Sequence, residues 1–212
     1  MNVRGANCVY NDAKFRRFYD ICSFITIDGF GILFGMKLLG YKVKSEHRFT
    51  CPNYLDSLLE SLSDKEISIY FLGSTQKISE KLNINLSNNY PKLKFRCHHG
   101  YFRKEGAENQ QIIKDINDFE PNILYLGFGM PLQEYWILDN YEKINTNIFL
   151  PLGACIDFHT NSVYRGPRIF TDNGFEWLTR LITEPKRLWF RYIIGNPLFM
   201  IRILVERVKH FK

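Results

Sequence analysis

Short apolar runs alternate with longer amphipathic segments over the first 160 residues, a pattern typical of a parallel sheet whose strands are joined by helices. The runs that we predict to be strands cover residues 24–27, 67–72, 93–97, 123–128 and 148–152. Helical spacing over residues 74–85 and 110–117 supplies two of the connecting helices. The pattern therefore predicts an α/β fold with a parallel sheet and flanking helices.

Three of the predicted strands end in glycine or aspartate. Asp28 follows the first, Gly73 follows the second, and Gly127 and Gly129 lie at the end of the fourth. In open α/β sheets, ligands bind outside the carboxyl ends of the strands, where small residues let backbone amides approach a phosphate group. We expect these three loops to form the binding pocket.

The pattern changes after residue 165. The segments FEWLTRLI, EPKRLWFRYII and NPLFMIRILVERVKHFK each have helical spacing, and Pro185 and Pro197 suit the first turns of the second and third. We predict a catalytic α/β domain over residues 1–165 and an appendage of about three short helices over residues 166–212.

The net charge of +6 belongs entirely to this appendage. From Arg180 onward there are eight Lys or Arg and two Glu, so residues 1–179 are formally neutral. Basic residues interleaved with Trp, Phe and Tyr suit an anionic membrane surface. A packing helix with a solvated basic edge is the second interpretation, and binding of nucleic acid is the third.

Several side chains at the predicted strand ends could carry chemistry. The carboxylate of Asp28 could remove a proton from an attacking hydroxyl, or it could only form the turn before the next helix. Asp157 could accept hydrogen bonds from a ribose or a uracil ring, or be a structural turn residue. Gln133 could bind a base or a ribose, although an ordinary strand-to-helix turn fits its segment equally well. Residues 42–48 are most simply a solvated charged loop, although Arg48 could reach a phosphate.

Composition excludes several classes of protein. The 212 residues are 45% hydrophobic, enough for a substantial core, so the chain is neither disordered nor fibrous. Five widely spread cysteines without a CxxC pair indicate reduced cytoplasmic thiols. His98 and His99 have no third ligand at a metal-binding spacing. The N-terminal segment does not resemble a signal peptide, and no run of eighteen apolar residues is free of charge, so we expect neither secretion nor a membrane span.

Taken in order, the motifs resemble the WecG/TagA/CpsF family of bacterial glycosyltransferases, also called glycosyltransferase family 26. The matching stretches extend over nearly the whole chain: IDGFGI, HRFTCPNYLDSLLE, YFLGS, NYPKLKF, HGYF, LGFGMPLQEYWI, GACIDFHTNSVYRGP and GFEWLTRLITEPKRLWFRY. The pairing of GxPxQE with EWxxRLxxEPxRxxxRY is the most specific part of this resemblance.

The resemblance implies a Rossmann-like fold and an inverting transfer that needs no metal ion or other cofactor. The family moves a hexose, such as an N-acetylmannosamine derivative or glucose, from a UDP-sugar to a saccharide linked to undecaprenyl diphosphate. Such an enzyme in cell-surface polysaccharide or teichoic-acid-type synthesis would be cytoplasmic and peripheral on the inner face of the membrane. Members of the family can self-associate, and nucleic acid is not an expected partner.

The resemblance also assigns roles to residues. Asp28 matches the proposed catalytic base. The positions matched to the nucleotide-sugar pocket are Asn7, Arg48, Gln133 and Asp157, beside the strand-end glycines Gly73, Gly127 and Gly129. The positions matched to the acceptor diphosphate are Arg180, Arg187 and Arg191.

Two departures from the family pattern matter. Relatives usually carry another strand and helix before the segment matching GANCVYND, and Gly5 stands where a threonine is common, two residues before Asn7. A truncated, inactive homologue is therefore one alternative function. A basic module that binds a membrane or nucleic acid is the other.

Overall fold

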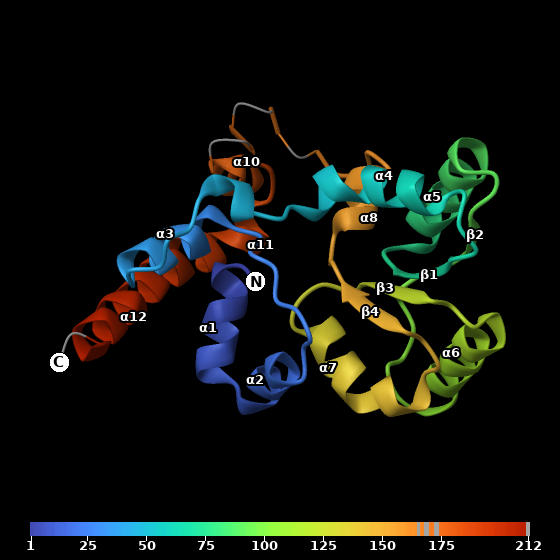
Figure 1. Cartoon of the computed structure of the whole chain (residues 1–212), viewed down its shortest axis with the longest axis horizontal. Coiled ribbons are helices and arrows are strands. Elements are labelled where there is room, and N and C mark those ends of the chain that lie inside the picture. Colours follow the sequence, from blue (N-terminus) through green and yellow to red (C-terminus); the bar gives the residue numbers. More distant parts are fainter. Residues whose placement is uncertain (165, 168–169, 172–173, 211–212) are drawn as a thin grey trace. The chain divides into compact units, whose positions relative to one another are not determined.

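The structure is a computed structural model that describes residues 1–164, 166–167, 170–171 and 174–210, without the side chains of residues 51–53 and 210. The chain forms two compact units (Figure 1). Unit 1 joins the two ends of the chain, Met1–Thr50 and Tyr164–Lys212, and unit 2 is the continuous segment Cys51–Val163. The functional division that we place at residue 165 stays a prediction.

Unit 2 contains the predicted parallel sheet. Its strands are β1 (Ser68–Gly73), β2 (Lys94–His98), β3 (Ile123–Gly127) and β4 (Ile148–Pro151), in the order β2-β1-β3-β4. All three pairings are parallel. The four apolar runs that begin at residues 67, 93, 123 and 148 are thus confirmed as strands, and so is the α/β class.

Helices cover both faces of this sheet, as Figure 1 shows. On one side, α4 (Cys51–Leu62), α5 (Gln76–Asn89) and α8 (Cys155–His159) pack on alternate strand residues in a core that includes Leu59, Leu82 and Phe71. The other face is covered by α6 (Gly106–Phe119) and α7 (Leu132–Asn140). Because β1 and β3 are buried on both faces, their sequences are continuously apolar rather than alternating.

The predicted strand over residues 24–27 is wrong. Among these residues only Ile27 forms a β-bridge, an isolated parallel one with Arg48, and Phe24 is 91% exposed. Residues 24–27 have the apolar composition of a strand, but they lie in unit 1, and the sheet lies in unit 2.

Unit 1 is helical. Its N-terminal helices are α1 (Val3–Asn11), α2 (Ala13–Asp20) and α3 (Phe30–Leu38), followed by the short 3₁₀ helix η1 (Ser45–His47). Asn2 caps α1 by accepting a hydrogen bond from the Gly5 amide at 3.1 Å, and Asp12 caps α2 in the same way through the Phe15 amide at 3.0 Å. A second 3₁₀ helix, η2 (Tyr141–Lys143), belongs to unit 2.

The C-terminal part of unit 1 contains α10 (Glu176–Thr183), α11 (Pro185–Trp189), η3 (Phe190–Ile194) and α12 (Gly195–His210). Pro185 occupies the first turn of α11, as predicted. Pro197 lies in the first turn of α12, as predicted, but the helix does not break before it, because one helix continues over Pro185–Lys209. Its segment η3 is π-helical and lies immediately before Gly195, and such a widened turn is one way to accommodate a proline, which lacks the N–H for an α-helical bond.

The helix over Pro185–Lys209 is long and apolar enough to cross a membrane, judged by length and composition alone. Only 17% of its apolar window is buried. The sequence-based expectation took the two arginines inside this window, Arg191 and Arg202, as interruptions.

A polar contact joins the first and last helices of unit 1. Arg202 donates to the side-chain oxygens of Asn7 and Asn11 at 2.8 and 2.6 Å, and its guanidinium lies 4.1 Å from the Tyr10 ring centroid. Asn7 in turn donates to the Gly195 carbonyl at 2.8 Å. Two positions of α12, about two helical turns apart, are therefore held against α1.

The cysteines differ partly from the prediction. Cys8, Cys22 and Cys97 are free thiols, and burial raises the pKa of Cys97 to about 12. Cys155, however, is disulfide-bonded, so the prediction of reduced thiols is wrong at that position. Spacing along the sequence carries no information on this bond, because the fold and not the spacing brings thiols together.

A buried polar network lies between α6 and α7. The Trp136 indole donates to Asn109 at 2.7 Å, Asn109 donates to Asn140 at 3.0 Å, and Asn140 donates to the Trp136 carbonyl at 2.8 Å. All three residues are at most 7% exposed. Since each polar group has a partner, the network orders the two helices without leaving a buried donor unpaired.

We predict that Asn109→Ala lowers the free energy of unfolding by about 2–4 kcal/mol, because it strands the Trp136 N–H and the Asn140 oxygen. Urea unfolding followed by tryptophan fluorescence measures this change. Asn88→Ala on the exposed side of α5 is the matched control and should shift stability by less than about 0.5 kcal/mol. Equal effects of the two substitutions would contradict the role of the network.

Candidate functional site

The carboxyl edge of the sheet is built from closely packed backbone. A Cβ atom added to Gly73 would lie 2.6 Å from the Gly127 Cα, and one added to Gly127 would lie 3.1 Å from the Gly153 carbonyl oxygen. The loop after β2 joins them, since Gly100 donates to the Ser74 carbonyl at 2.8 Å. The glycines that we predicted at strand ends, Gly73 and Gly127, therefore lie together in unit 2.

Asp157 lies at this same edge. The Ser74 hydroxyl, one residue beyond β1, donates a short hydrogen bond to its carboxylate. Ser74 has a φ of +59°, a conformation that is uncommon for a residue other than glycine and that recurs at functional sites. The side chain of Asp157 is only partly buried.

The buried side chain of Gln133 is hydrogen-bonded to the loop that follows β3. Its side chain is 4% exposed, accepts a hydrogen bond from the Gly129 amide at 3.2 Å and donates to Glu134 at 2.9 Å. Gly129 has a φ of +80°, which favours glycine at that position. In this structure Gln133 thus shapes the loop after β3, and direct contact with a nucleotide stays a prediction.

Unit 1 contains the remaining predicted residues. Asp28 lies just before α3, where its backbone amide donates to the Met1 carbonyl at 2.8 Å and its carboxylate faces the Asn2 amide at 3.4 Å. Its side chain is partly exposed. The carboxylate also interacts electrostatically with Arg191 from the C-terminal helix, so segments far apart in the sequence converge on it.

Arginines gather near this carboxylate. Burial lowers the pKa of the Arg191 guanidinium, Tyr192 and Asp28 oppose the shift, and the positive charges of Arg180 and Arg4 add to it. Two arginines thus act on the guanidinium of a third, and such a group of cations is suited to an anion. Arg180 and Arg191 thus lie close enough to interact, and Arg4 joins them although no feature of its sequence neighbourhood marked it. The role of Arg180 and Arg191 toward an acceptor diphosphate stays a prediction.

The other predicted residues of unit 1 lie in separate contacts. Arg187 forms a two-bond ion pair with Glu184, at 2.5 and 2.7 Å, which lowers the pKa of that carboxyl group. Arg48 donates to the Thr171 carbonyl at 3.2 Å and lies 4.2 Å from the Phe30 ring centroid. Asn7 uses its amide to join α1 and α12. The ligand roles assigned to these three residues stay predictions.

The loop after β2 carries a pair of stacked imidazoles. The rings of His98 and His99 are 4.5 Å apart, and burial, with the charges of His98 and Lys104, lowers the pKa of His99. Within residues 1–164 and the described parts of the remainder, no three His, Cys, Asp or Glu side chains are grouped to bind a metal ion.

Comparison with known proteins decides the family. The model of the glycosyl transferase WecG/TagA/CpsF family matches residues 1–212. The chain belongs to this family. It is therefore a glycosyltransferase, as the motifs indicated.

Curated relatives include N-acetylglucosaminyldiphosphoundecaprenol N-acetyl-beta-D-mannosaminyltransferases of Staphylococcus aureus, from strains MRSA252, NCTC 8325 / PS 47 and COL. Each is 28% identical to this chain over 187 residues, which cover 88% of the chain and 71% of the relative. The chain is thus a distant homologue of enzymes that transfer N-acetylmannosamine to a lipid-linked acceptor.

We predict that Gly73→Ala destabilises the protein by about 1–3 kcal/mol, because the new methyl group would overlap the Gly127 backbone, which cannot move aside as a side chain can. Thermal unfolding measures the change. Gly29→Ala is the control, since its added Cβ would come no closer than 3.7 Å to a neighbouring side chain. A Gly73→Ala protein as stable as Gly29→Ala would contradict the close packing.

Proposed function

We propose that this chain transfers a sugar of the N-acetylmannosamine type from a UDP-sugar to a saccharide linked to undecaprenyl diphosphate, with inversion and without a metal ion. The observation that carries the proposal is the convergence of Arg180 and Arg191 with Asp28 in unit 1, which combines a base with cations for an acceptor diphosphate. The names of the staphylococcal relatives specify a diphosphoundecaprenol acceptor and an N-acetylmannosaminyl group, which supports the same substrate class.

The donor features belong to unit 2. A UDP moiety suits the glycine-built strand ends around Gly73, Gly127 and Gly129, with the Asp157 carboxylate accepting from the ribose hydroxyls. Backbone amides and cations can stabilise the diphosphate that leaves, so the reaction needs no divalent ion.

The proposed reaction is a single displacement. Asp28 takes the proton of the acceptor hydroxyl, the hydroxyl oxygen forms a bond to the anomeric carbon, and the bond from that carbon to the UDP oxygen breaks. The electron pair of the broken bond stays on UDP. Attack opposite the leaving group inverts the anomeric centre.

We expect Asp28→Asn to lower the rate of transfer by about 10²–10⁴ with little effect on stability, since the amide cannot accept the proton. The assay measures acceptor-dependent UDP release from UDP-N-acetylmannosamine with a short-chain lipid-diphosphate N-acetylglucosamine. Asp20→Asn on the exposed end of α2 is the control and should transfer at the wild-type rate. Wild-type turnover by the Asp28 variant would remove this residue from the role of base.

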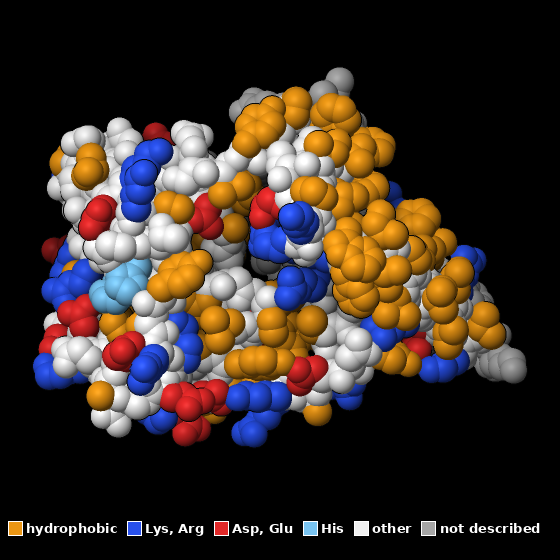
Figure 2. All heavy atoms as spheres, turned by 180° about the vertical axis from the view of Figure 1, so that it is seen from behind, with side chains coloured by type: hydrophobic (Ala, Val, Ile, Leu, Met, Phe, Trp, Pro, Cys, Tyr) orange, Lys and Arg blue, Asp and Glu red, His pale blue; other side chains and the backbone are white. Residues whose placement is uncertain are grey.

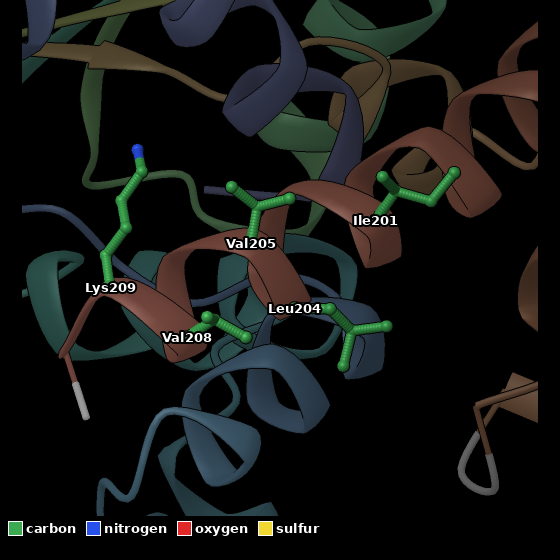
Figure 3. A pocket seen from close by; sticks show the side chains of 5 residues that line it. All are labelled: Ile201, Leu204, Val205, Val208 and Lys209. Atoms are coloured by element: carbon green, nitrogen blue, oxygen red, sulfur yellow. The ribbon is translucent and has the colours of Figure 1, made fainter. Parts of the chain in front are cut away.

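The proposed location is the inner face of the cell membrane, and α12 supplies the support for it. Apolar side chains gather over the C-terminal helix in Figure 2. Figure 3 shows Ile201, Leu204, Val205 and Val208 with Lys209 around a shallow recess on α12. The four apolar residues are 50–61% exposed, and their spacing of three and four places them along one side of the helix.

The opposite side of α12 favours a helix that lies on the surface over one that spans it. Phe199 is 5% exposed and faces Gly35 of α3, and Arg202 is bonded to α1. A spanning helix would have to give up these contacts and take Arg202 into the bilayer, which costs about 2.5 kcal/mol or more. An interfacial helix keeps the contacts and inserts only its exposed apolar side, with basic residues near lipid headgroups.

We predict that the double substitution Leu204→Glu and Val208→Glu lowers binding to vesicles containing anionic lipid by at least tenfold. Two charged groups would replace apolar area that the bilayer buries when the helix binds. Vesicle flotation measures the bound fraction. Ile84→Glu on α5 of unit 2, at a residue 59% exposed, is the matched control and should bind like the wild type. Unchanged flotation of the double variant would contradict this surface as the anchor.

A further inference from the structure

Lys104 is a lysine that the motifs did not single out, and its ammonium group is fixed at the carboxyl edge of the sheet. It donates to the Gly100 carbonyl at 2.6 Å and to the Phe102 carbonyl at 3.1 Å. Gly100 is itself part of the packed strand ends, since an added Cβ there would lie 3.1 Å from the Gly73 Cα. Lys104 lies two residues before α6, and its side chain extends toward the loops around Gly73 and Gly127.

Two aromatic rings also lie close to this ammonium group. The Nζ atom lies 3.5 Å from the Phe102 ring centroid and 4.2 Å from that of Phe128, the residue directly after β3. Trp136, which the Asn109 network holds, packs edge-on against Phe128 at 5.7 Å. Ring faces attract a cation, and rigid support keeps this one in place.

The charge has no carboxylate to neutralise it. Among the described residues Lys104 forms no ion pair, and the side chain of Glu108, the nearest acid acting on it, accepts the Arg103 amide hydrogen at 2.7 Å. Burial lowers the pKa of Lys104 to about 8, with Glu108 opposing the shift. A partly buried cation held this way is destabilised until an anion reaches it.

An ammonium group has three N–H donors, and the two carbonyls use two of them. We propose that the third N–H group binds the diphosphate of the UDP-sugar. Lys104 is then a substrate-binding residue that keeps its contact with the diphosphate while UDP leaves. This inference rests on the proposed function. The negative charge on the leaving diphosphate increases as its bond to the sugar breaks, and a fixed cation stabilises that increase more than it stabilises the ground state.

A purely structural role is the competing interpretation, since the same two bonds also hold the loop between Gly100 and Phe102. The two roles differ in their effect on the nucleoside without phosphates. A phosphate contact changes the affinity for UDP and leaves uridine unaffected, whereas a disturbed loop changes both.

Isothermal titration calorimetry with UDP and uridine as probes distinguishes these cases on the whole chain. We expect Lys104→Met to lower the affinity for UDP at least tenfold at pH 7.5, because a charge-assisted hydrogen bond is lost. The affinity for uridine should change by less than twofold. Lys92→Met is the control, since Lys92 is exposed and paired with Asp64 at 2.9 Å. Equal UDP affinity in Lys104→Met and wild type, or equal losses for UDP and uridine, would overturn the assignment.

Dependence on pH gives a second, independent measurement. Below about pH 8 the Lys104 ammonium is charged, and above it the charge is lost, so wild-type UDP affinity should fall between pH 7.5 and 9. Lys104→Arg keeps its charge and should bind UDP without this fall. The other titratable or charged groups in and next to this loop are present in both proteins: His98, His99, Tyr101, Arg103, Glu105 and Glu108. The same fall in both proteins would assign it to those groups and overturn the role of Lys104.

Wild-type protein that binds neither probe would contradict the UDP-sugar proposal itself, and the assignment of Lys104 would fail with it. Wild-type protein that binds UDP, beside a Lys104→Met variant of equal affinity, would contradict the lysine alone.

Discussion

The packing of bare backbone at the carboxyl edge of the sheet is the constraint on which the rest of unit 2 depends. Gly73 and Gly127 approach so closely that a methyl group on either would meet main-chain atoms. This closeness brings the segments after β1, β2, β3 and β4 together, and with them Ser74, Lys104 and Asp157. These polar side chains lie one to four residues beyond Gly73, Gly100 and Gly153, whose lack of a side chain makes the close packing possible.

The parallel sheet could be predicted from the sequence because strands buried on both faces are continuous apolar runs, and β1 and β3 fit that rule. Residues 24–27 show its limit. Apolar composition predicts burial or pairing in general, but it does not say which unit of the chain a segment will join. The long C-terminal helix shows another limit, because Pro197 marks a break in sequence and the π-helical turn before it removes the need for one.

The candidate site was predictable where strand ends carry it and where family motifs mark it. Asp28, Asp157 and the glycines belong to this group. Arg4 and Lys104 do not, because their importance comes from what tertiary structure places near them: other arginines in one case, two carbonyls and two aromatic rings in the other. Gln133 shows the converse, since a motif residue is used here to hold a loop.

The joining of α1 to α12 through Asn7, Gly195 and Arg202 has a consequence for how the protein is made. Unit 2 is one continuous segment, so all of its contacts can form while the chain is still being synthesised. Unit 1 cannot complete its fold until the last helix is synthesised, because α1 packs against α12 only after residues 195–210 leave the ribosome. The proposed base and arginines are therefore assembled last, and a nascent chain acquires its acceptor-side chemistry only as the basic helix itself is completed.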